Sequence, residues 1–433
     1  MKNLRMTSRA LAISVAGLVL AAMALPAGAI DITNKDGDWT FSFNGNVNVD
    51  YIYSNCQSVN SAAVVAGGLT CVGSASSSNV SNIGNGLLPA AFSFGVATTQ
   101  NGIDLAAHLG LYPGIATNDG GSPNLQQTTK NGSSNTALGT TGLDVRQVYM
   151  TFGNKAMGTF TLGRNIGLFG ADVILNDMTL PGVGAPGSAA SAAPANTTLG
   201  GIGFGYIYTD WLAQIDYTTP DYSGFNLTVG LFDPLNSLSE GDATVQPKKA
   251  PGFHAKATYT LPFASGDKLY VSVAFLTQQQ YYQTAATATP ASTNYNYTGN
   301  GVDIFAKLDI QAFEVIGYYY HATGLGTTAL FDGGAWQGQT RGSDGYFAQV
   351  SYLFGNLKVG LNYGDSRLKF ANAFDSVANP DLVSSNRKGT LGLYYSLTKN
   401  LTLLAEGSEV KSYAQSGGSN SATTVNVGAF FKF

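Results

Sequence analysis

The sequence is poor in charged residues, cysteine and histidine, and these scarcities exclude several classes of protein. Only 11% of its 433 residues are charged, well below the roughly 25% of soluble domains. Lysine and arginine total 22 against 26 acidic residues, and this acidic balance argues against a nucleic-acid partner. The three histidines, His108, His254 and His321, stand in no metal-ligand or nucleophile motif. We therefore expect no metal, no cofactor and no enzyme activity.

Long apolar runs are also missing after residue 29, so no segment approaches the roughly 20 residues of a transmembrane helix. The first 29 residues differ. Lys2, Arg5 and Arg9 precede a short apolar run at 11–24, and the run ends near an Ala-x-Ala cleavage site at 27–29. We expect residues 1–29 to be a signal peptide and 30–433 to form one mature domain, with a membrane anchor as the alternative. Without the signal the balance is 19 − 26 = −7.

Residues 39–53 alternate between apolar and polar side chains, which predicts a β-strand. Aromatic and aliphatic residues such as Trp39, Phe41 and Val49 share one face, while Ser42, Asn48 and other polar residues share the opposite face. We assign the apolar face to lipid and the polar face to water, because the pattern recurs along the chain. The other predicted strands are 92–96, 103–111, 143–152, 159–164, 204–217, 225–232, 253–261, 269–275, 302–308, 313–319, 346–354, 357–363, 389–397, 401–409 and 425–433.

Short turns and long Gly/Ser/Thr/Asn-rich loops alternate between these strands, as in outer-membrane barrels. Lipid forbids open sheet edges, so the sheet must close. The predicted fold is therefore all-β, a transmembrane antiparallel β-barrel of about sixteen strands around an aqueous channel. The insertion at 165–201 is too long for an ordinary hairpin loop. We expect it to fold into the barrel and narrow it; a linker between domains is the alternative.

The two cysteines, Cys56 and Cys71, would both lie in an oxidising compartment after export, which favours a disulfide. Closing a loop of roughly 15 residues would stabilise the fold by about 3 kcal/mol in the chain-entropy model. Two free thiols or a metal-binding pair are the alternatives.

Four segments together resemble the Gram-negative general (diffusion) porins, especially those of β-proteobacterial type. They are RQVYMTFG with GTFTLGR within 143–164, WLAQIDYTTPDYSGFNLTVGLF at 211–232, LGLYYSLTKNLTLLAEGSEV at 391–410, and the terminal VNVGAFFKF. The resemblance implies a homotrimeric outer-membrane channel for passive diffusion of ions and small hydrophilic solutes, embedded in lipid and lipopolysaccharide. It also implies an inward-folded third outer loop, and Phe433 resembles the terminal signal read by the outer-membrane assembly machinery.

The inward face of each predicted strand supplies candidate pore-lining residues, because charges along a bore set ion preference. From strand parity these are Asp104, His108, Asp144, Arg146, His254, Lys256, Asp303, Lys307, Glu314, Lys358 and Glu406. The porin resemblance adds Asp172 and Asp177 on the inserted loop, facing Arg146 and Arg164 on the wall. Parity supports an inward Arg146 but gives no clear support for Arg164. The alternative for each residue is a solvated charge without effect on selectivity.

Two other functions fit the same barrel. A substrate-specific porin would line its bore with an aromatic track, for which Tyr318 or Tyr394 are candidates. A structural or adhesive barrel would bind a partner through its outer loops and keep its bore closed. Conductance separates both channels from the adhesive barrel, and saturation of flux by one solute separates a specific channel from a general one.

Overall fold

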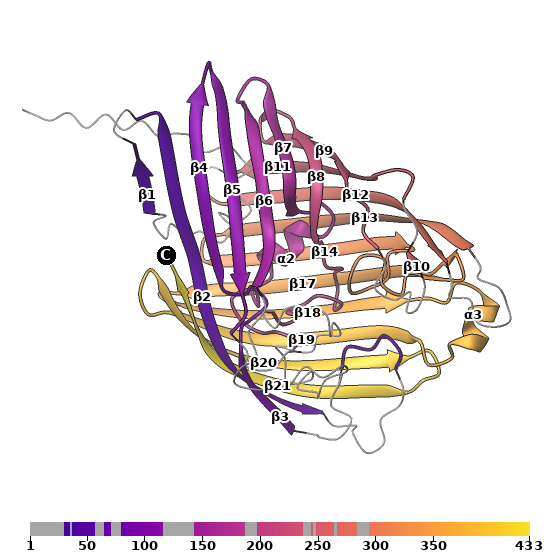
Figure 1. Cartoon of the computed structure of the whole chain (residues 1–433). Helices are drawn as coiled ribbons and strands as arrows, with labels where there is room; N and C mark the ends of the chain where they lie inside the picture. The colour runs from indigo at the N-terminus through magenta and orange to yellow at the C-terminus, as the bar shows by residue number, and fades with distance from the viewer. Residues whose placement is uncertain are drawn as a thin grey trace, which may run out of the picture.

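The computed structural model describes residues 30–34, 37–56, 65–70, 79–115, 143–186, 197–236, 244–245, 248–263, 266–283 and 294–433. The expected signal peptide and Cys71 lie outside these residues, whereas Cys56 is disulfide-bonded. Within the described part, sixteen antiparallel strands form a closed ring (Figure 1). In ring order they are β2 (Trp39–Cys56), β4 (Ala91–Gln100), β5 (Ile103–Pro113), β6 (Leu143–Asn154), β7 (Gly158–Ile166), β8 (Trp211–Thr218), β9 (Phe225–Phe232), β11 (Gly252–Pro262), β12 (Lys268–Gln283), β13 (Asn294–Ile310), β14 (Phe313–Thr323), β17 (Gly342–Phe354), β18 (Leu357–Leu368), β19 (Val383–Ser396), β20 (Leu401–Ala414) and β21 (Ser419–Lys432).

The ring closes on β2, which pairs with β4 along one edge and with β21 along the other. Phe433 and Gly45 exchange two backbone hydrogen bonds of 2.9 and 3.0 Å. The short strand β1 (Ile30–Thr33) continues the same edge of β2 beyond the C-terminus. Both ends of the described chain therefore lie at the end of the barrel where short turns join the strands. We call this the short-turn end, and the opposite one the long-loop end.

Each of the sixteen strands predicted from the sequence corresponds to one strand of the ring, with two differences of extent. Alternation predicts a strand from residue 204, but β8 begins only at Trp211. Several strands also run further toward the long-loop end, as β12 does to Gln283 and β13 from Asn294. The apolar–polar alternation that marks a strand is lost there, because both faces carry polar side chains.

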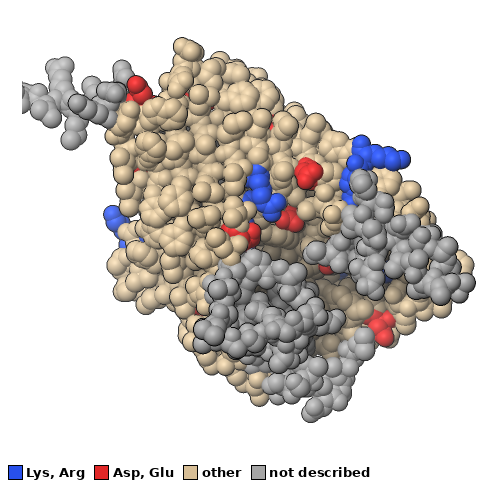
Figure 2. Space-filling model, viewed as in Figure 1, with Lys and Arg blue, Asp and Glu red and all other residues tan. Residues whose placement is uncertain are grey.

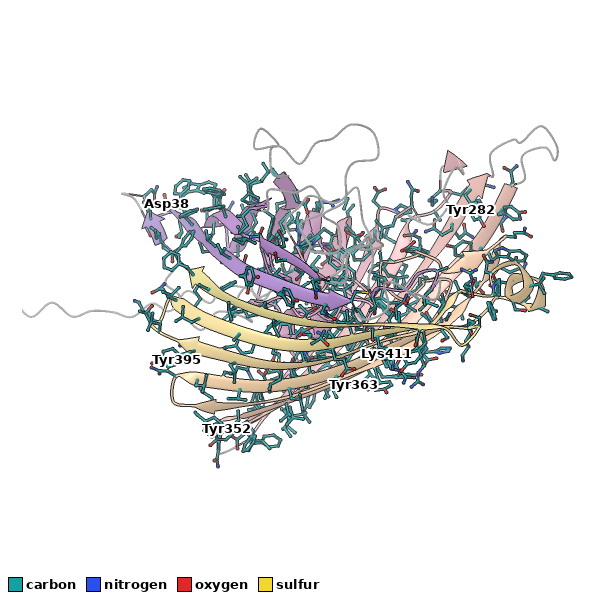
Figure 3. The ribbon with its side chains drawn as sticks, turned by 90° about the horizontal axis from the view of Figure 1, so that it is seen from below. Asp38, Tyr282, Tyr352, Tyr363, Tyr395 and Lys411 are labelled. Carbon is teal, nitrogen blue, oxygen red and sulfur yellow. The ribbon has the colours of Figure 1, made fainter. Side chains whose placement is uncertain are left out.

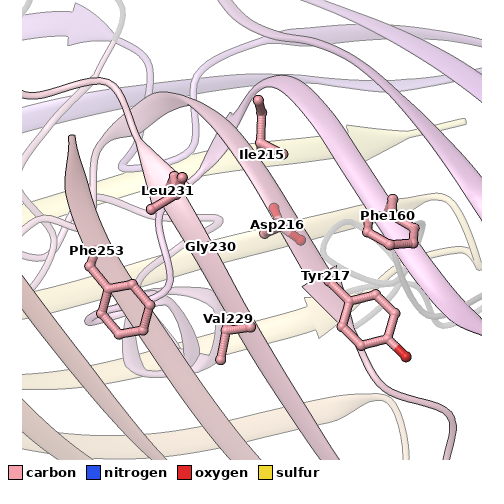
Figure 4. Close-up of a pocket in the computed structure, with 8 residues that line it drawn as sticks. All are labelled: Phe160, Ile215, Asp216, Tyr217, Val229, Gly230, Leu231 and Phe253. Atoms are coloured by element: carbon pink, nitrogen blue, oxygen red, sulfur yellow. The ribbon is translucent and has the colours of Figure 1, made fainter. Parts of the chain in front are cut away.

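The outer face of the ring is apolar, as expected for a surface against lipid. Directly paired residues share a face, and outward pairs such as Leu361 with Leu391 are more than half exposed. Figure 2 shows that only scattered charged side chains reach the face seen there. An open groove on this surface is lined almost entirely by apolar side chains (Figure 4), among them Phe160, Ile215, Tyr217, Val229, Leu231 and Phe253. No helix within the described residues is long and apolar enough to cross a bilayer.

The inner face is not polar throughout, which corrects the expectation from strand alternation. Phe305, Tyr320 and Phe347 on β13, β14 and β17 point inward and are at most 1% exposed. They belong to an inner apolar cluster with residues of the insertion after β7 and of the loop that carries β15 (Ala335–Trp336) and β16 (Gln339–Thr340). Its loop members include Phe169, Phe204, Tyr206, Ile207, Leu325, Leu330 and Phe331. One side of the barrel interior is therefore a packed core.

Glycines let the insertion approach the wall closely. A side chain on Gly364 of β18 would collide with the carbonyl oxygen of Phe204. The neighbouring Gly205 has a φ of +116°, and its N–H donates to the Ser366 hydroxyl at 2.8 Å. Backbone therefore packs on backbone at this point, which leaves no room for a methyl group.

An ion pair at the long-loop end joins two outer loops. Arg341 donates two hydrogen bonds, of 2.6 and 2.8 Å, to the carboxylate of Asp375, a bidentate arrangement. Asp375 lies in α3 (Ala373–Ala378), whose first N–H groups are capped by the side chain of Asn372. Burial acts to raise the pKa of Asp375, but hydrogen bonds from Arg341, the Ala371 N–H and Asn379 outweigh it and lower that pKa.

We expect Gly364→Ala to destabilise the barrel by about 1–3 kcal/mol, the usual cost of overpacking a tight site. The matched control is Gly407→Ala on β20, because nothing lies within 4 Å of the point that a methyl group there would occupy. Thermal unfolding of the detergent-solubilised barrel measures both. Equal midpoints for the two variants would contradict the close approach of the insertion to β18.

The Arg341–Asp375 ion pair also makes the stability of the barrel depend on pH. Because the folded-state pKa of Asp375 is lowered, its ion pair stabilises the fold above the unfolded pKa near 4 and loses this effect as the pH falls through the folded value. Asp375→Asn should therefore lower the unfolding temperature at pH 7. The difference from the unmodified protein should shrink below about pH 4. A difference independent of pH would show that the charge of Asp375 is not responsible.

Candidate functional site

The insertion between β7 and β8 lies against the inner wall and carries a short helix, α2 (Ala171–Asn176), inside the ring (Figure 1). Gly170 precedes the helix with a φ of +74°, which a residue with a side chain rarely adopts. Its N–H donates to the Asp303 carboxylate of β13 at 2.7 Å. Asp303 is 4% exposed. A buried carboxylate on the wall therefore fixes the start of the helix.

Asp172, on the first turn of α2, faces three donors from the adjoining wall strands β11 and β12. Lys256 and Tyr270 each donate to its carboxylate at 3.2 Å, and the Ser272 hydroxyl donates at 2.5 Å. The side chains of Asp172 and Lys256 are still 15% and 16% exposed. The porin resemblance placed Asp172 opposite arginines, but a lysine and two hydroxyl groups face it. Tyr270 and Ser272 could not be recognised from the sequence as partners of Asp172, because polar inward residues occur on every strand.

A second group of charges continues along the wall from α2. Glu314 on β14 accepts from Lys307 at 2.8 Å and from Lys358 at 3.1 Å. Lys307 also donates to the side chain of Asn176, the last residue of α2, at 3.2 Å. The side chains of Lys307, Glu314 and Lys358 are 18%, 20% and 35% exposed. Together with Asp172 and Lys256 they form a row of alternating, partly exposed charges, which we call the inner charge row.

Arg146 points inward as parity predicted, at a bulge in the pairing of β5 with β6. Its guanidinium donates to Asp144 at 2.7 Å. It also lies 5.2 Å from the ring centre of Tyr112 and 6.0 Å from that of Trp211. Arg146 is only 7% exposed, so its charge is largely matched by Asp144 and enclosed by aromatic rings.

Arg164 lies on the outer face, which contradicts its assignment to the bore. It pairs directly with Val148, which is 49% exposed, and with Ala213 of β8. The pairing of β6 with β7 runs without a register shift through Gly163, so this glycine does not turn Arg164 inward. The porin motif suggested an inward arginine, whereas alternation along β7 describes its position correctly.

Asp104 and His108 occupy inward positions on β5. His108 stacks on Tyr149, with ring centres 4.7 Å apart. Asp104, near the short-turn end, accepts a hydrogen bond from Thr99 at 2.7 Å. His254 differs from both, because it is 1% exposed and stacks on Phe232 at 3.9 Å. Parity placed all three on the correct face without revealing that His254 is buried.

Two other predicted acids hold the insertion in place. Asp177, 2% exposed, accepts from the Tyr206 hydroxyl at 2.8 Å and from Asn362 at 3.1 Å. Glu406 on β20 accepts from the N–H groups of Val183 and Gly184, both at 2.8 Å. The expectation that Asp177 faces Arg146 and Arg164 is therefore wrong. Its hydrogen bonds come from Tyr206 and Asn362, and the basic wall residue that interacts with it is the buried Lys388 of β19. Sequence alternation cannot distinguish a carboxylate that anchors a loop from one that faces water.

The insertion is also held from the opposite side of the ring. Residues 85–90 interrupt the pairing along β2 between β3 (Asn79–Gly84) and β4. In this interruption, Leu87 donates to the Gly182 carbonyl at 2.6 Å, and Leu88 donates to the Leu180 carbonyl at 2.9 Å. The insertion is therefore tied to β2–β4 on one side and to β13, β18 and β20 on the others.

The tyrosines considered for an aromatic track are both buried. Tyr318 is 5% exposed and donates to Asp303 at 3.4 Å, while Tyr394 is 6% exposed and donates to Glu406 at 2.6 Å. They pack the insertion against the wall, so they do not form an exposed track. In the part of the chain that the structure describes, no group of three acidic, histidine or cysteine residues is placed to hold a metal ion.

A family model described as Gram-negative porin matches residues 12–415. Among solved structures, the outer membrane channel DcaP of Acinetobacter baumannii is similar with a TM-score of 0.64 at 15% identity, covering 93% of this chain and 99% of that one. An anion-selective porin from Comamonas acidovorans gives 0.56 at 15% identity, covering 92% and 100%. The trimer form of OmpT from Vibrio cholerae gives 0.51 at 12% identity, again covering 92% and 100%. No curated protein sequence matches the chain significantly.

The anchoring role of Glu406 predicts a specific loss of stability. Glu406→Leu keeps a side chain of similar size but removes the carboxylate, whose Oε2 accepts from both Val183 and Gly184 and whose Oε1 accepts from the Tyr394 hydroxyl. We expect about 1–3 kcal/mol of destabilisation, because buried donors lose their partner. Glu409→Leu is the control on the same strand, where the side chain is exposed and the change should stay within about 0.5 kcal/mol. Thermal unfolding in detergent measures both, and equal losses would contradict the anchor.

Proposed function

The chain belongs to the Gram-negative porin family and is an outer-membrane channel for passive diffusion, and we propose that the inner charge row borders its narrowest passage. Ions and small hydrophilic solutes would pass beside the insertion that carries α2. The observation that carries this proposal is the set of five partly exposed charges within 3.2 Å of a partner of opposite sign. Such charges remain accessible to water and create a field across the bore.

We further propose that ion selectivity is weak. Asp309 lies 3.7 Å from Lys307, so three lysines along the row face three carboxylates. Neither sign dominates near α2, and the pair of buried Arg146 with partly exposed Asp144 adds no net charge. The anion-selective porin from Comamonas acidovorans shares the fold, but the balance of charges in this chain does not favour anion selectivity. A general diffusion channel therefore fits the inner face better than a substrate-specific one.

The same proposal includes export and assembly. Residues 1–29 would direct the chain to the periplasm, and 30–433 would form the mature barrel. Phe433 would be bound by the assembly machinery, since it closes an aromatic group with Phe43, Phe92 and Phe431 at the seam of the ring. In the membrane the barrel would associate as a homotrimer, the form in which OmpT from Vibrio cholerae was solved, and would contact lipid and lipopolysaccharide.

Reversal potentials in a planar bilayer under a salt gradient test the inner charge row. Lys256→Gln leaves Asp172 without its cation, so the potential should move toward cation preference. Asp172→Asn should move it in the opposite direction for the converse reason. Arg164→Gln, which removes a charge from the outer face, is the matched control and should leave the potential unchanged.

Shifts of the same sign for Lys256→Gln and Asp172→Asn, or no shift for either, would show that these residues do not border the passage. Absence of any conductance from folded, unmodified protein would instead indicate a bore closed by the insertion.

A further inference from the structure

Charged residues gather on the outer face of the ring, where most of the surface is apolar. They lie at the long-loop end of β17–β20, beyond the exposed Leu361–Leu391 pair. The next outward pair is Tyr363 with Gly389, and then the charges begin with Asp365 opposite Arg387. We call the four cations the outer basic patch, and they are Arg367, Lys369, Arg387 and Lys411. Figure 3 shows Tyr363 and Lys411 far along the strands from Tyr352 and Tyr395, which mark the short-turn end.

The height of the patch agrees with the position of lipid headgroups. On β18 the outward residues run from Leu357, paired with Tyr395, to Asp365, a distance of 365 − 357 = 8 residues. Eight residues span about 26 Å along a strand, or about 20 Å of membrane thickness at a tilt near 40°. The apolar band of such barrels is about 25 Å tall. The patch therefore begins near the level where acyl chains end.

Carboxylates beneath the patch hold the cations at the surface. The side chain of Asp365 is 1% exposed, and it lies 3.1 Å from a nitrogen of Arg367 and 3.3 Å from Arg387. Asp344 is 17% exposed and lies 3.9 Å from Lys369. The cations themselves are open to solvent, with side-chain exposures of 46% for Arg367, 42% for Arg387 and 70% for Lys369. These two acids lie underneath the cations. Glu409 on β20, paired with Gly389, carries an exposed carboxylate beside the patch, so the surface presented outward is positive on balance.

Aromatic rings fix the orientation of the same cations. The guanidinium of Arg387 lies 4.9 Å from the ring centre of Tyr413, and the ammonium of Lys411 lies 5.1 Å from it. Arg367 lies 5.4 Å from the ring centre of Tyr346. Such contacts favour one orientation of each cation. Arg387 uses only its Nε, toward Ser385 and Asp365, so among the described residues its two terminal nitrogens make no hydrogen bond and remain available to a ligand.

We propose that the outer basic patch docks the phosphate groups of lipopolysaccharide, the phosphorylated glycolipid of the outer leaflet. This proposal rests on the proposed function, because lipopolysaccharide reaches the patch only if the barrel lies in the outer membrane. A planar guanidinium matches two phosphate oxygens at once, and the adjoining apolar band accommodates the acyl chains of the same molecule. The patch thus recognises both parts of one lipid, which an isolated surface cation does not.

The test measures lipid binding to the folded, full-length mature barrel by native mass spectrometry after delipidation. The probes are lipid A with two phosphates and the same lipid with both phosphates removed. The double variant Arg367→Gln/Arg387→Gln should bind the bisphosphorylated lipid at least about tenfold more weakly, as expected for lost hydrogen bonds to a charged group. Its affinity for the dephosphorylated lipid should not change. The control is Lys155→Gln/Lys399→Gln, which removes two cations from short turns and should affect neither lipid.

Three outcomes would overturn the proposal. They are an unchanged affinity for the bisphosphorylated lipid, an equal loss for both lipids, or dissociation of subunits in lipid-free Arg367→Gln/Arg387→Gln, which would assign the patch to a contact between copies. Conductance of the same variants distinguishes a failure of the lipid proposal from a failure of the channel proposal. The double variant should conduct normally, since its residues lie outside the bore, so a failure of lipid binding leaves the channel proposal standing. A lack of conductance in the unmodified protein would leave the lipid measurement valid.

Discussion

The pairing of backbone N–H and C=O groups in lipid is the constraint on which the rest of this structure depends. An unpaired group in the hydrocarbon region costs several kcal/mol, so a sheet that crosses a membrane must close. The chain satisfies this by pairing both edges of β2, and Phe433 bonds with Gly45 where the ring meets itself. Once the ring is closed, side chains are free to differ between its two faces. Lipid selects apolar residues on the outer face, whereas the residues on the inner face depend on whether they contact a folded-in loop or water.

The inside is divided between packing and charge. On one side, wall residues such as Phe305 and Tyr320 form a core with the insertion and a second outer loop. Beside this core lies the inner charge row, in which each charged side chain has a partner and remains partly exposed. The apolar contacts supply the stability that fixes α2, and α2 in turn places Asp172 opposite Lys256. The charges are therefore positioned by hydrophobic packing and by the buried carboxylates of Asp303 and Glu406.

Period-two alternation was sufficient to find the sixteen strands, because lipid imposes an apolar residue at every second position. It also placed Arg146 inward, and it gave no support to the motif-based assignment of Arg164 to the bore. It could not identify the inner apolar cluster, since a residue such as Ile316 faces inward for a reason that lies in a distant loop. For the same reason Asp177 was misassigned, because its partners Tyr206 and Asn362 are far from it in sequence. The predicted strands ended too early where the wall extends beyond the lipid. Lipid no longer selects an apolar residue at every second position there, so the alternation that marks a strand disappears.

The attachment of the insertion to opposite sides of the ring also has a mechanical meaning. Leu87 and Leu88 hold it next to β2, while Asp303 holds it on β13. A hollow cylinder whose wall is one sheet thick flattens easily into an ellipse under sideways pressure. A member bonded across its interior resists this deformation in both compression and tension. The insertion therefore acts as a cross-brace, because it bonds to the wall at β13 and to the segment beside β2.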